Sequence, residues 1–271
     1  MNAAAMSDEF DTQKLQFIIP RSSFLASSVA EMIKVILLDI EGTTTPIDFV
    51  HRTLFPFAFE KIGEYLERNF DSIQAEIDEL REEHERDFQN GLDIPLLHET
   101  TRENLIKSLT NYLHFLIRND RKSTPLKSLQ GKIWQKGYES GELVSQVYDD
   151  VPPAFGRWKS QNKTIAIYSS GSRLAQRLLF KYTNHGDLTA FISNYFDTNT
   201  GHKREAESYR RIASTQSFPQ VENFLFVSDI EAELDAAGEA GMQTVLSARA
   251  GNAPLAEAPT HKIIRSFDEI F

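Results

Sequence analysis

Two short apolar segments, far apart in the sequence, each end in an acidic residue. Residues 35–38 (Val-Ile-Leu-Leu) lead into Asp39, and residues 224–227 (Phe-Leu-Phe-Val) lead through Ser228 into Asp229. Short runs rich in β-branched and aromatic residues are typical of buried strands. Because ligands bind outside the carboxyl ends of strands in an open parallel sheet, we expect both acids to point at one spot. Clustered carboxylates suit a hard cation such as Mg²⁺, and an aspartate can attack phosphorus, so phosphoryl chemistry is the leading interpretation.

Composition limits the classes of protein that remain. The chain has 271 residues, 41% hydrophobic and 25% charged, and both fractions are ordinary for a globular protein. Its formal net charge of −10 argues against broad nucleic-acid binding, which needs a basic footprint. The lack of cysteine excludes disulfides, zinc thiolates and thiol catalysis, and no apolar run approaches the ~18 residues of a membrane-spanning helix. We therefore expect a cytoplasmic monomer with neither nucleic acid nor membrane as a partner.

The first 31 residues differ from the rest of the chain. They are rich in Ala and Ser, and Lys14 and Arg21 are their only bases. Transit peptides are basic and poor in acids, so they are a poor match for a segment that also holds several acids. We expect residues 1–31 to form a flexible N-terminal extension and the folded part to begin at Met32.

Helical periodicity fills the block that follows the first strand. Apolar residues recur at intervals of three and four from Phe55 to Leu66, as in the apolar stripe of an amphipathic helix. Similar stripes predict three more helices, near residues 73–80, 105–117 and 126–138. The sequence therefore predicts an all-helical insert over residues 47–141.

After Pro152-Pro153 the pattern changes to alternating strands and helices. Strands are predicted at residues 164–168, 190–192 (with 195–196), 224–227, 243–246 and 262–264, and helices at 173–182, 206–213 and 232–240. Such alternation predicts a parallel sheet covered on both faces. The fold class is therefore α/β, with a Rossmann-like core from residues 32–46 and 142–271. The helical insert would sit over the carboxyl edge of the sheet as a cap.

Two acids stand close together after the first predicted strand. Asp39 is followed by Glu41 and then by Gly42, which permits a tight turn of the chain. One of these acids can attack phosphorus while the other transfers protons. The same residues would also suit a helix N-terminus, where acids act as capping groups.

Three further candidates follow the other predicted strands. Ser169 and Ser170 come directly after residues 164–168 and precede a helix, where hydroxyl and free N–H groups form a phosphate cradle. Lys203 precedes the next helix and is a compact cation suited to a phosphoryl group. Asp229 lies nearest to the end of its strand among the acids there, and is therefore the best metal ligand.

The order of these residues resembles that of the haloacid-dehalogenase superfamily of phosphohydrolases. One difference points to a particular family within the superfamily, because most members have an Asp where this chain has Glu41. The run Asp39-Ile40-Glu41-Gly42-Thr43-Thr44 is similar to the bifunctional enolase-phosphatases of methionine salvage, the acireductone synthases. The resemblance spans roughly residues 32–271. The other segments similar to that family are Phe49-Val50-His51, Leu54-Phe55-Pro56, Leu129-Gln130-Gly131-Lys132-Ile133-Trp134, Tyr168-Ser169-Ser170-Gly171-Ser172 and Glu233-Leu234-Asp235-Ala236-Ala237.

The resemblance implies a Mg²⁺-dependent reaction on a small phosphorylated diketone. By that resemblance the substrate is 2,3-diketo-5-methylthiopentyl-1-phosphate, which is enolised and then dephosphorylated to the acireductone. Asp39 would accept the phosphoryl group and Glu41 would move protons, while Ser169, Ser170 and Lys203 would hold the phosphate. Asp39, Asp229 and the residue at position 41 would bind the metal.

Several alternatives stay open at this point. Either the carbonyl or the side chain of Glu41 could face the metal. A capped sugar-phosphatase or phosphomutase of the same superfamily is a second enzyme interpretation, which Glu41 and the motifs of the insert disfavour. A signalling module with a phospho-accepting Asp is a third, but in such modules the acceptor follows an earlier acidic pair. In the insert, Trp134 and Tyr138 could line the pocket, although packing is the simpler expectation.

Overall fold

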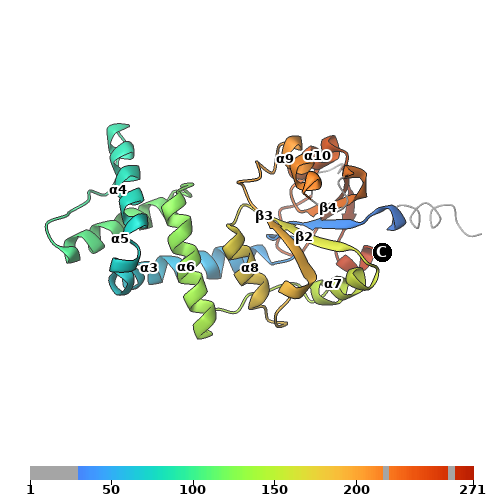
Figure 1. Ribbon diagram of the computed structural model, residues 1–271, viewed down its shortest axis with the longest axis horizontal. Coiled ribbons are helices and arrows are strands. Elements are labelled where there is room, and N and C mark those ends of the chain that lie inside the picture. The colour runs from blue at the N-terminus through green and yellow to red at the C-terminus, as the bar shows by residue number, and fades with distance from the viewer. Residues whose placement is uncertain (1–29, 216–219, 256–259) are drawn as a thin grey trace, which may run out of the picture.

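Six parallel strands form one sheet (Figure 1). The computed structural model describes residues 30–215, 220–255 and 260–271. Within these residues the strand order is β3-β2-β1-β4-β5-β6, and every neighbouring pair is parallel. The strands are Val35–Leu38 (β1), Thr164–Tyr168 (β2), Ile192–Phe196 (β3), Phe224–Ser228 (β4), Gln243–Ser247 (β5) and Lys262–Ile264 (β6). The predicted parallel α/β sheet is confirmed.

β1 lies inside the sheet although it is the first strand in the sequence. Its last residue, Leu38, is paired with Ile167 of β2 and with Val227 of β4. Asp39 is therefore level with Tyr168 on one side and with Ser228 on the other. Since all the strands run in one direction, their carboxyl ends share one edge of the sheet, and the candidate residues follow β1, β2 and β4 at that edge.

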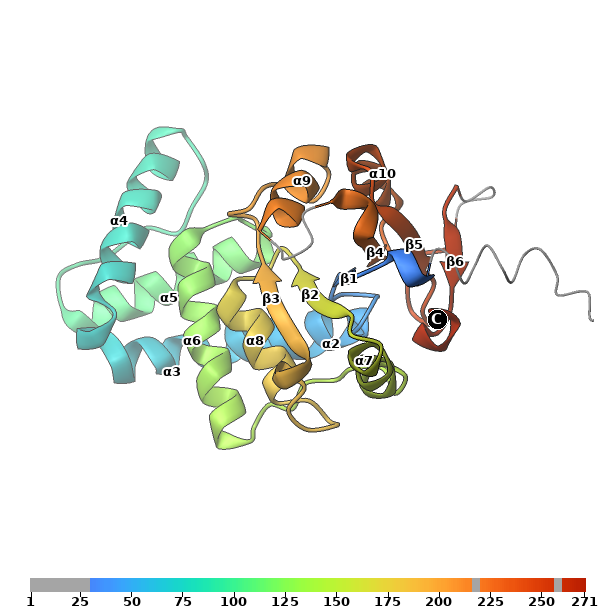
Figure 2. The same ribbon diagram turned by 45° about the vertical axis from the view of Figure 1, so that its right-hand side comes forward.

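Helices cover both faces of the sheet (Figures 1 and 2). Val35 and Leu37 of β1 pack with the helices on one face, whereas Ile36 and Leu38 pack with those on the other. Burial of both faces explains why the strands are almost continuously apolar. The first face is covered by α9 (Ala206–Ser214) and α10 (Glu231–Ala240), and the second by α7 (Val151–Ser160) and α8 (Arg173–Lys181).

A lobe of helices is inserted between β1 and β2 and lies at one end of the molecule (Figure 1). Its members are α2 (Ile47–Phe49), α3 (Phe55–Asn69), α4 (Gln74–Gln89), α5 (Arg102–Arg118) and α6 (Thr124–Ser140). They enclose a hydrophobic core of their own, with Ile62, Leu109 and Leu113 fully buried in it. The four predicted helices are thus confirmed as α3 to α6. That the lobe is a domain separate from the sheet stays a prediction.

A second apolar cluster joins the lobe to the sheet. Phe49, Val50 and Leu54 pack there with Tyr138 of α6 and with Leu178 of α8. The segment Val50–Leu54 is a π-helical turn, which the sequence did not predict. Such turns are rare and are frequently found at functional sites. The helical lobe is therefore anchored close to the end of β1.

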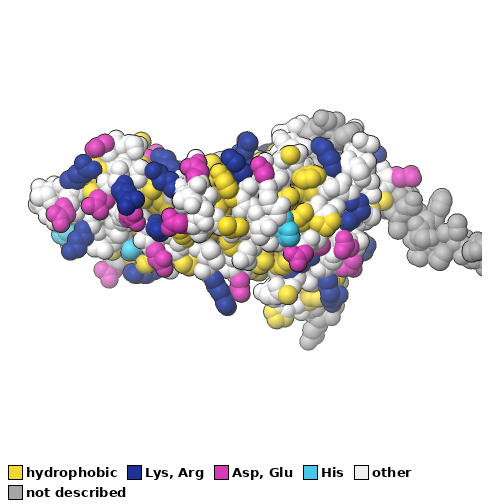
Figure 3. Space-filling model, turned by 90° about the horizontal axis from the view of Figure 1, so that it is seen from below, with side chains coloured by type: hydrophobic (Ala, Val, Ile, Leu, Met, Phe, Trp, Pro, Cys, Tyr) yellow, Lys and Arg dark blue, Asp and Glu magenta, His cyan; other side chains and the backbone are white. Residues whose placement is uncertain are grey.

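The surface of the helical lobe carries both signs of charge. On the face in Figure 3, basic and acidic side chains are interspersed over this lobe. On α4, Arg81 pairs with Asp78 at 2.7 Å and Arg86 pairs with Glu82 at 3.9 Å. Mixed charge of this kind is typical of a solvated surface. Among the described helices, none is long and apolar enough to cross a membrane.

One strand begins later than the sequence predicted. Residues 190–192 were expected to be extended, but Thr189–Phe191 form a 3₁₀ turn and β3 begins at Ile192. The side chain of Asp187 accepts a hydrogen bond from the Thr189 backbone N–H at 2.8 Å, and this local contact favours a turn. The predicted extension at residues 1–31 lies almost entirely outside the described residues.

Candidate active site

Asp39 is fixed at the carboxyl end of β1 by three hydrogen-bond donors. The residue is only 5% exposed. Its Oδ1 accepts a hydrogen bond from the Ile40 backbone N–H at 2.8 Å and lies 2.6 Å from the ammonium nitrogen of Lys203. Its Oδ2 accepts a longer hydrogen bond, 3.4 Å, from the Ser228 hydroxyl. The carboxylate is thus held in one orientation at the sheet edge, as a nucleophile requires.

Lys203 bridges two carboxylates. Its Nζ lies 2.6 Å from Asp39 Oδ1 and 2.6 Å from Glu233 Oε2, and its side chain is 10% exposed. Burial by itself would lower the pKa of Lys203, but the two carboxylates outweigh that effect and raise the pKa above its usual value. Lys203 is therefore a permanent cation at neutral pH.

Two buried tyrosines hold the loop that carries Lys203. The Tyr209 hydroxyl donates to the Lys203 carbonyl at 2.6 Å, and the Tyr168 hydroxyl donates to the Gly201 carbonyl at 2.8 Å. Both rings belong to the core beneath α9 and α10. The position of the ammonium group is therefore set by the core rather than by a mobile loop.

Glu233 belongs to this site although the sequence analysis did not select it. It lies in the first turn of α10 and accepts a hydrogen bond from the Ser228 hydroxyl at 2.9 Å, besides pairing with Lys203. Burial and the charge of Asp39 raise its pKa, partly against the effect of Lys203. A usable signal did exist: a helix that follows a strand begins at the carboxyl edge, so acids in its first turn can face that edge.

Asp229 lies beside the turn that follows Asp39. Burial, together with the charge of Asp39, raises its pKa to about 7. Its carboxylate packs against Gly42, which has a φ of +66°, and a Cβ atom on Gly42 would lie 2.4 Å from Asp229 Oδ2. Glycine is therefore required at position 42 for two reasons, its backbone conformation and the space taken by Asp229.

Glu41 extends toward the helical lobe. Its carboxylate lies 3.8 Å from the His51 ring nitrogen Nε2, on the π-helical turn, and its side chain is 42% exposed. Partial desolvation and the nearby Asp39 raise the pKa of Glu41, while His51, Lys203 and Lys122 oppose the rise. A raised pKa makes this carboxyl group accept a proton more readily than an ordinary exposed glutamate does.

The loop after β2 brings hydroxyl groups to the same edge. Ser169 is buried and its Oγ accepts a hydrogen bond from the Gly171 N–H at 3.2 Å, whereas Ser170 is exposed. The buried Gln176 fastens this loop, because its amide donates to the carbonyls of Gly171 and Phe196, each at 2.8 Å. The loop precedes α8, so its free N–H groups can bind an anion.

Donors from β5 and the segments around it hold the turn at residues 42–45. Ser247 Oγ and Asn252 Nδ2 donate to the Gly42 carbonyl at 3.1 and 2.9 Å, and Arg249 Nε donates to the Thr43 carbonyl at 3.2 Å. Arg249 is itself buried and pairs with Asp150 at 2.7 Å. These contacts join residues about 200 positions apart, and no local pattern in the sequence indicates them.

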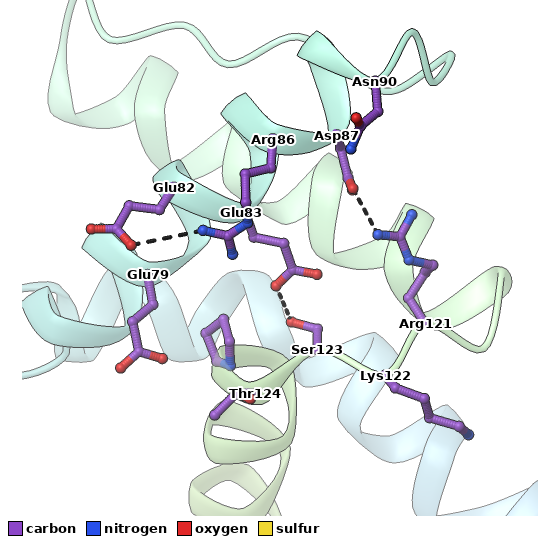
Figure 4. A pocket seen from close by; sticks show the side chains of 11 residues that line it. Glu79, Glu82, Glu83, Arg86, Asp87, Asn90, Arg121, Lys122, Ser123 and Thr124 are labelled. Atoms are coloured by element: carbon purple, nitrogen blue, oxygen red, sulfur yellow. Dashed lines mark hydrogen bonds and ion pairs between the residues drawn. The ribbon is translucent and has the colours of Figure 1, made fainter.

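The helical lobe has a charged cavity of its own. A cavity of about 480 Å³ opens between α4 and the loop that enters α6, and Arg121 pairs with the buried Asp87 in it (Figure 4). Lys122 lines the same cavity, and its charge contributes to lowering the pKa of Glu41. Trp134 instead donates to the Leu54 carbonyl at 2.8 Å, and Tyr138 is buried, so both pack.

The carboxylates at this edge provide only part of a site for a hard cation such as Mg²⁺. Within the described residues, no group of three or more His, Asp or Glu side chains is arranged to hold a metal ion. Burial raises the pKa of Asp229, however, and repulsion from Asp39 raises it further; a cation between the two carboxylates would relieve this repulsion. Mg²⁺ commonly binds through one or two carboxylates and takes its other ligands from water and substrate phosphate.

The fold and site place the chain in a known class. A family model for haloacid dehalogenase-like hydrolases matches residues 33–241, which is most of the chain. The chain is therefore a haloacid dehalogenase-like hydrolase. The enolase-phosphatase E1 of Synechococcus elongatus is 49% identical to it over 240 residues, which cover 88% of this chain and 98% of the relative. The chain belongs to the enolase-phosphatase E1 family.

Other relatives agree with this assignment. The enolase-phosphatase E1 of Drosophila willistoni is 45% identical over 87% of this chain and 95% of its own length. A probable bifunctional methylthioribulose-1-phosphate dehydratase/enolase-phosphatase E1 of Populus trichocarpa is also 45% identical, but the match covers only 46% of it. Among solved structures, the UTR4 protein of Saccharomyces cerevisiae is 34% identical with a TM-score of 0.70, over 88% of this chain and 100% of that one.

Gly42→Ala should destabilise the protein more than glycine replacement alone would. Gly91→Ala is a matched control, because Gly91 has a φ of +73° and nothing within 4 Å of an added Cβ. We expect the control to lose about 1–2 kcal/mol of unfolding free energy from backbone strain. Gly42→Ala should lose about 1–3 kcal/mol more from overpacking against Asp229. Urea unfolding measures both, and equal losses would mean that Asp229 does not constrain position 42.

Proposed function

We propose that this chain is a Mg²⁺-dependent enolase-phosphatase that acts on 2,3-diketo-5-methylthiopentyl-1-phosphate. The products would be the acireductone, 1,2-dihydroxy-3-keto-5-methylthiopentene, and phosphate. The observation that carries the proposal is the buried carboxylate of Asp39, whose Oδ1 is 2.6 Å from the Lys203 ammonium at the sheet edge. Relatives such as that of Populus trichocarpa combine this activity, by name, with a methylthioribulose-1-phosphate dehydratase. A dehydrated methylthioribulose phosphate is a methylthio diketone phosphate, which supports this substrate and a place in methionine salvage.

In the phosphatase half, Asp39 would be the nucleophile. A bond forms between one of its carboxylate oxygens and phosphorus, and the bond from phosphorus to the ester oxygen breaks. Water then attacks the aspartyl phosphate and restores Asp39. Ser169 and Ser170 would donate hydrogen bonds to the phosphoryl oxygens, and Lys203 would offset their charge.

In the enolase half, Glu41 would move the proton. It would take a proton from the carbon next to a carbonyl group, and the same proton could then be returned to an oxygen. The raised pKa of Glu41 supports this role, because a more basic carboxylate accepts a proton more readily. The position of Glu41 opposite His51 supports a site formed jointly by the core and the helical lobe.

The proposed cation would be held by Asp39, Asp229 and the residue at position 41. Because the Glu41 side chain extends toward His51, we favour its main-chain carbonyl over its carboxylate as the ligand. When bound, Mg²⁺ supplies positive charge that neutralises the carboxylates and the phosphoryl oxygens. The chain's own residues orient the phosphate, exclude water and move the protons.

The remaining parts of the proposal concern organisation and setting. We propose that residues 32–46 and 142–271 form the core domain, that residues 47–141 form the cap, and that residues 1–31 are an extension. We also propose a cytoplasmic monomer with no nucleic-acid or membrane partner. The net charge of −10 and the absence of cysteine support this setting.

Asp39→Asn should abolish phosphate release from the diketo phosphate in the presence of Mg²⁺. The amide is nearly isosteric but is a very poor nucleophile, so we expect a fall of at least about 10³-fold. The assay measures phosphate from the diketo phosphate and from a panel of sugar phosphates, with and without EDTA. Release by Asp39→Asn near the wild-type rate would exclude Asp39 as the acceptor, and a preference for sugar phosphates would contradict the proposed substrate.

Glu41→Gln should impair enolisation. General acid–base groups contribute about 10²–10⁴-fold, so overall turnover should fall by that factor while the fold is kept. The ultraviolet absorbance of the enol and the release of phosphate report the two half-reactions separately. Glu142→Gln is a matched control, because Glu142 is an exposed acid that pairs with Lys61 on the surface. If both half-reactions kept their rates in Glu41→Gln, another group would have to move the proton.

Asp229 should make stability depend on pH when no cation is present. Its pKa is about 7 in the fold and about 3.9 in an unfolded chain. Between these values the folded chain binds more protons, so the free energy of unfolding falls as the pH rises from about 4 to about 7. In EDTA we expect wild type to lose about 2–4 kcal/mol more than Asp229→Asn across this range.

Urea unfolding at pH 4.5 and 7.5 measures that difference. The exposed Asp71 gives the control Asp71→Asn, which should follow wild type. Addition of Mg²⁺ at pH 7.5 should restore stability to wild type and not to Asp229→Asn. The same pH slope in wild type and Asp229→Asn would show that Asp229 is not the titrating acid.

A further inference from the structure

Asn252 has a fixed amide orientation. Its Nδ2 donates to the Gly42 carbonyl at 2.9 Å and to the Ser247 carbonyl at 3.1 Å. A flipped amide would place an acceptor against both carbonyl oxygens, so the network assigns this orientation. The adjacent turn is anchored as well, because the Asn252 N–H bonds to the carbonyl of the buried Arg249. The direction of Asn252 Oδ1 is thereby set.

That oxygen is buried next to another acceptor. Among the described residues, Asn252 Oδ1 has no hydrogen-bond donor. It lies 2.9 Å from where a Cβ on Gly42 would be, and Asp229 Oδ2 lies 2.4 Å from the same point. Buried polar atoms in proteins nearly always have a partner. A donor or a cation beside these two acceptors would satisfy the unpaired oxygen.

We propose that Asn252 is a positioning residue for the cation site, through a hydrogen bond that Oδ1 accepts from a water ligand of the cation. This role rests on the proposed function, which places Mg²⁺ on Asp39 and Asp229. Mg²⁺ retains several of its waters in protein sites, and the hydrogens of such a water point away from the metal toward outer acceptors. The amide therefore links the cation site to the turn after the nucleophile, since its Nδ2 binds the Gly42 carbonyl.

The test measures the affinity for Mn²⁺, with the full chain and the metal alone. Electron paramagnetic resonance reports free Mn²⁺ during a titration and does not require turnover. Asn252→Leu and Asn252→Ala, which remove the oxygen, should bind Mn²⁺ about 10–100-fold more weakly than wild type.

The control is Ser247→Ala, which removes the other side-chain donor to the Gly42 carbonyl and leaves Asn252 Oδ1 in place. It should bind Mn²⁺ within about threefold of wild type, and circular dichroism melts without metal show which variants fold. Equal losses in Ser247→Ala and Asn252→Ala would overturn the proposal. Unchanged affinity in Asn252→Ala would do the same and leave the proposed function standing. No Mn²⁺ binding by wild type would overturn the metal requirement of the proposed function and this role with it.

Discussion

The ammonium group of Lys203 is the interaction on which the site depends. It lies between Asp39 and Glu233, at 2.6 Å from each, in a place with little access to solvent. Removing one partner from a buried charge group costs about 3–5 kcal/mol, because the others stay buried without compensation. Tyr168 and Tyr209 hold the Lys203 loop, and thereby keep the ammonium group paired with both carboxylates.

Negative charge exceeds positive charge at this edge of the sheet, and the excess affects how the edge can bind a phosphate. One buried cation faces Asp39, Asp229 and Glu233, and burial and mutual repulsion raise the pKa of the latter two. A phosphate group brought to such an edge would meet excess negative charge. A divalent cation would reverse the sign of the local potential, so the same carboxylates that repel the substrate would provide the means to bind it.

Much of the site could be predicted because one geometric rule governs it. Asp39, Ser169 and Asp229 each follow a strand, and strands in a parallel sheet end at one edge, so an apolar run followed by a polar residue is enough to place them. Glu233 lies in the first turn of the helix that follows β4, which indicates that it can face the edge. Its partner Lys203 is 30 positions away, however, and no local pattern indicates that pairing. Asn252 and Ser247 are further still from their partner Gly42, and only the pairing of β4 with β5 brings them there.

Helical periodicity likewise predicted α3 to α6 but not the π-helical turn that carries His51, because that turn depends on packing against α6 and α8.

The interior position of β1 also bears on how the protein is made. A ribosome releases Asp39 early, yet Ser228, which hydrogen-bonds to it, is 189 residues later in the chain. β1 cannot complete its pairing until β4 has been synthesised, whereas the helical lobe has its own core and all of its residues by then. At the ~5–20 residues per second of translation, the nascent chain spends roughly ten seconds or more with an apolar strand exposed. Early contacts between β1 and the newly formed helices, or a chaperone, would have to shield that strand during this interval.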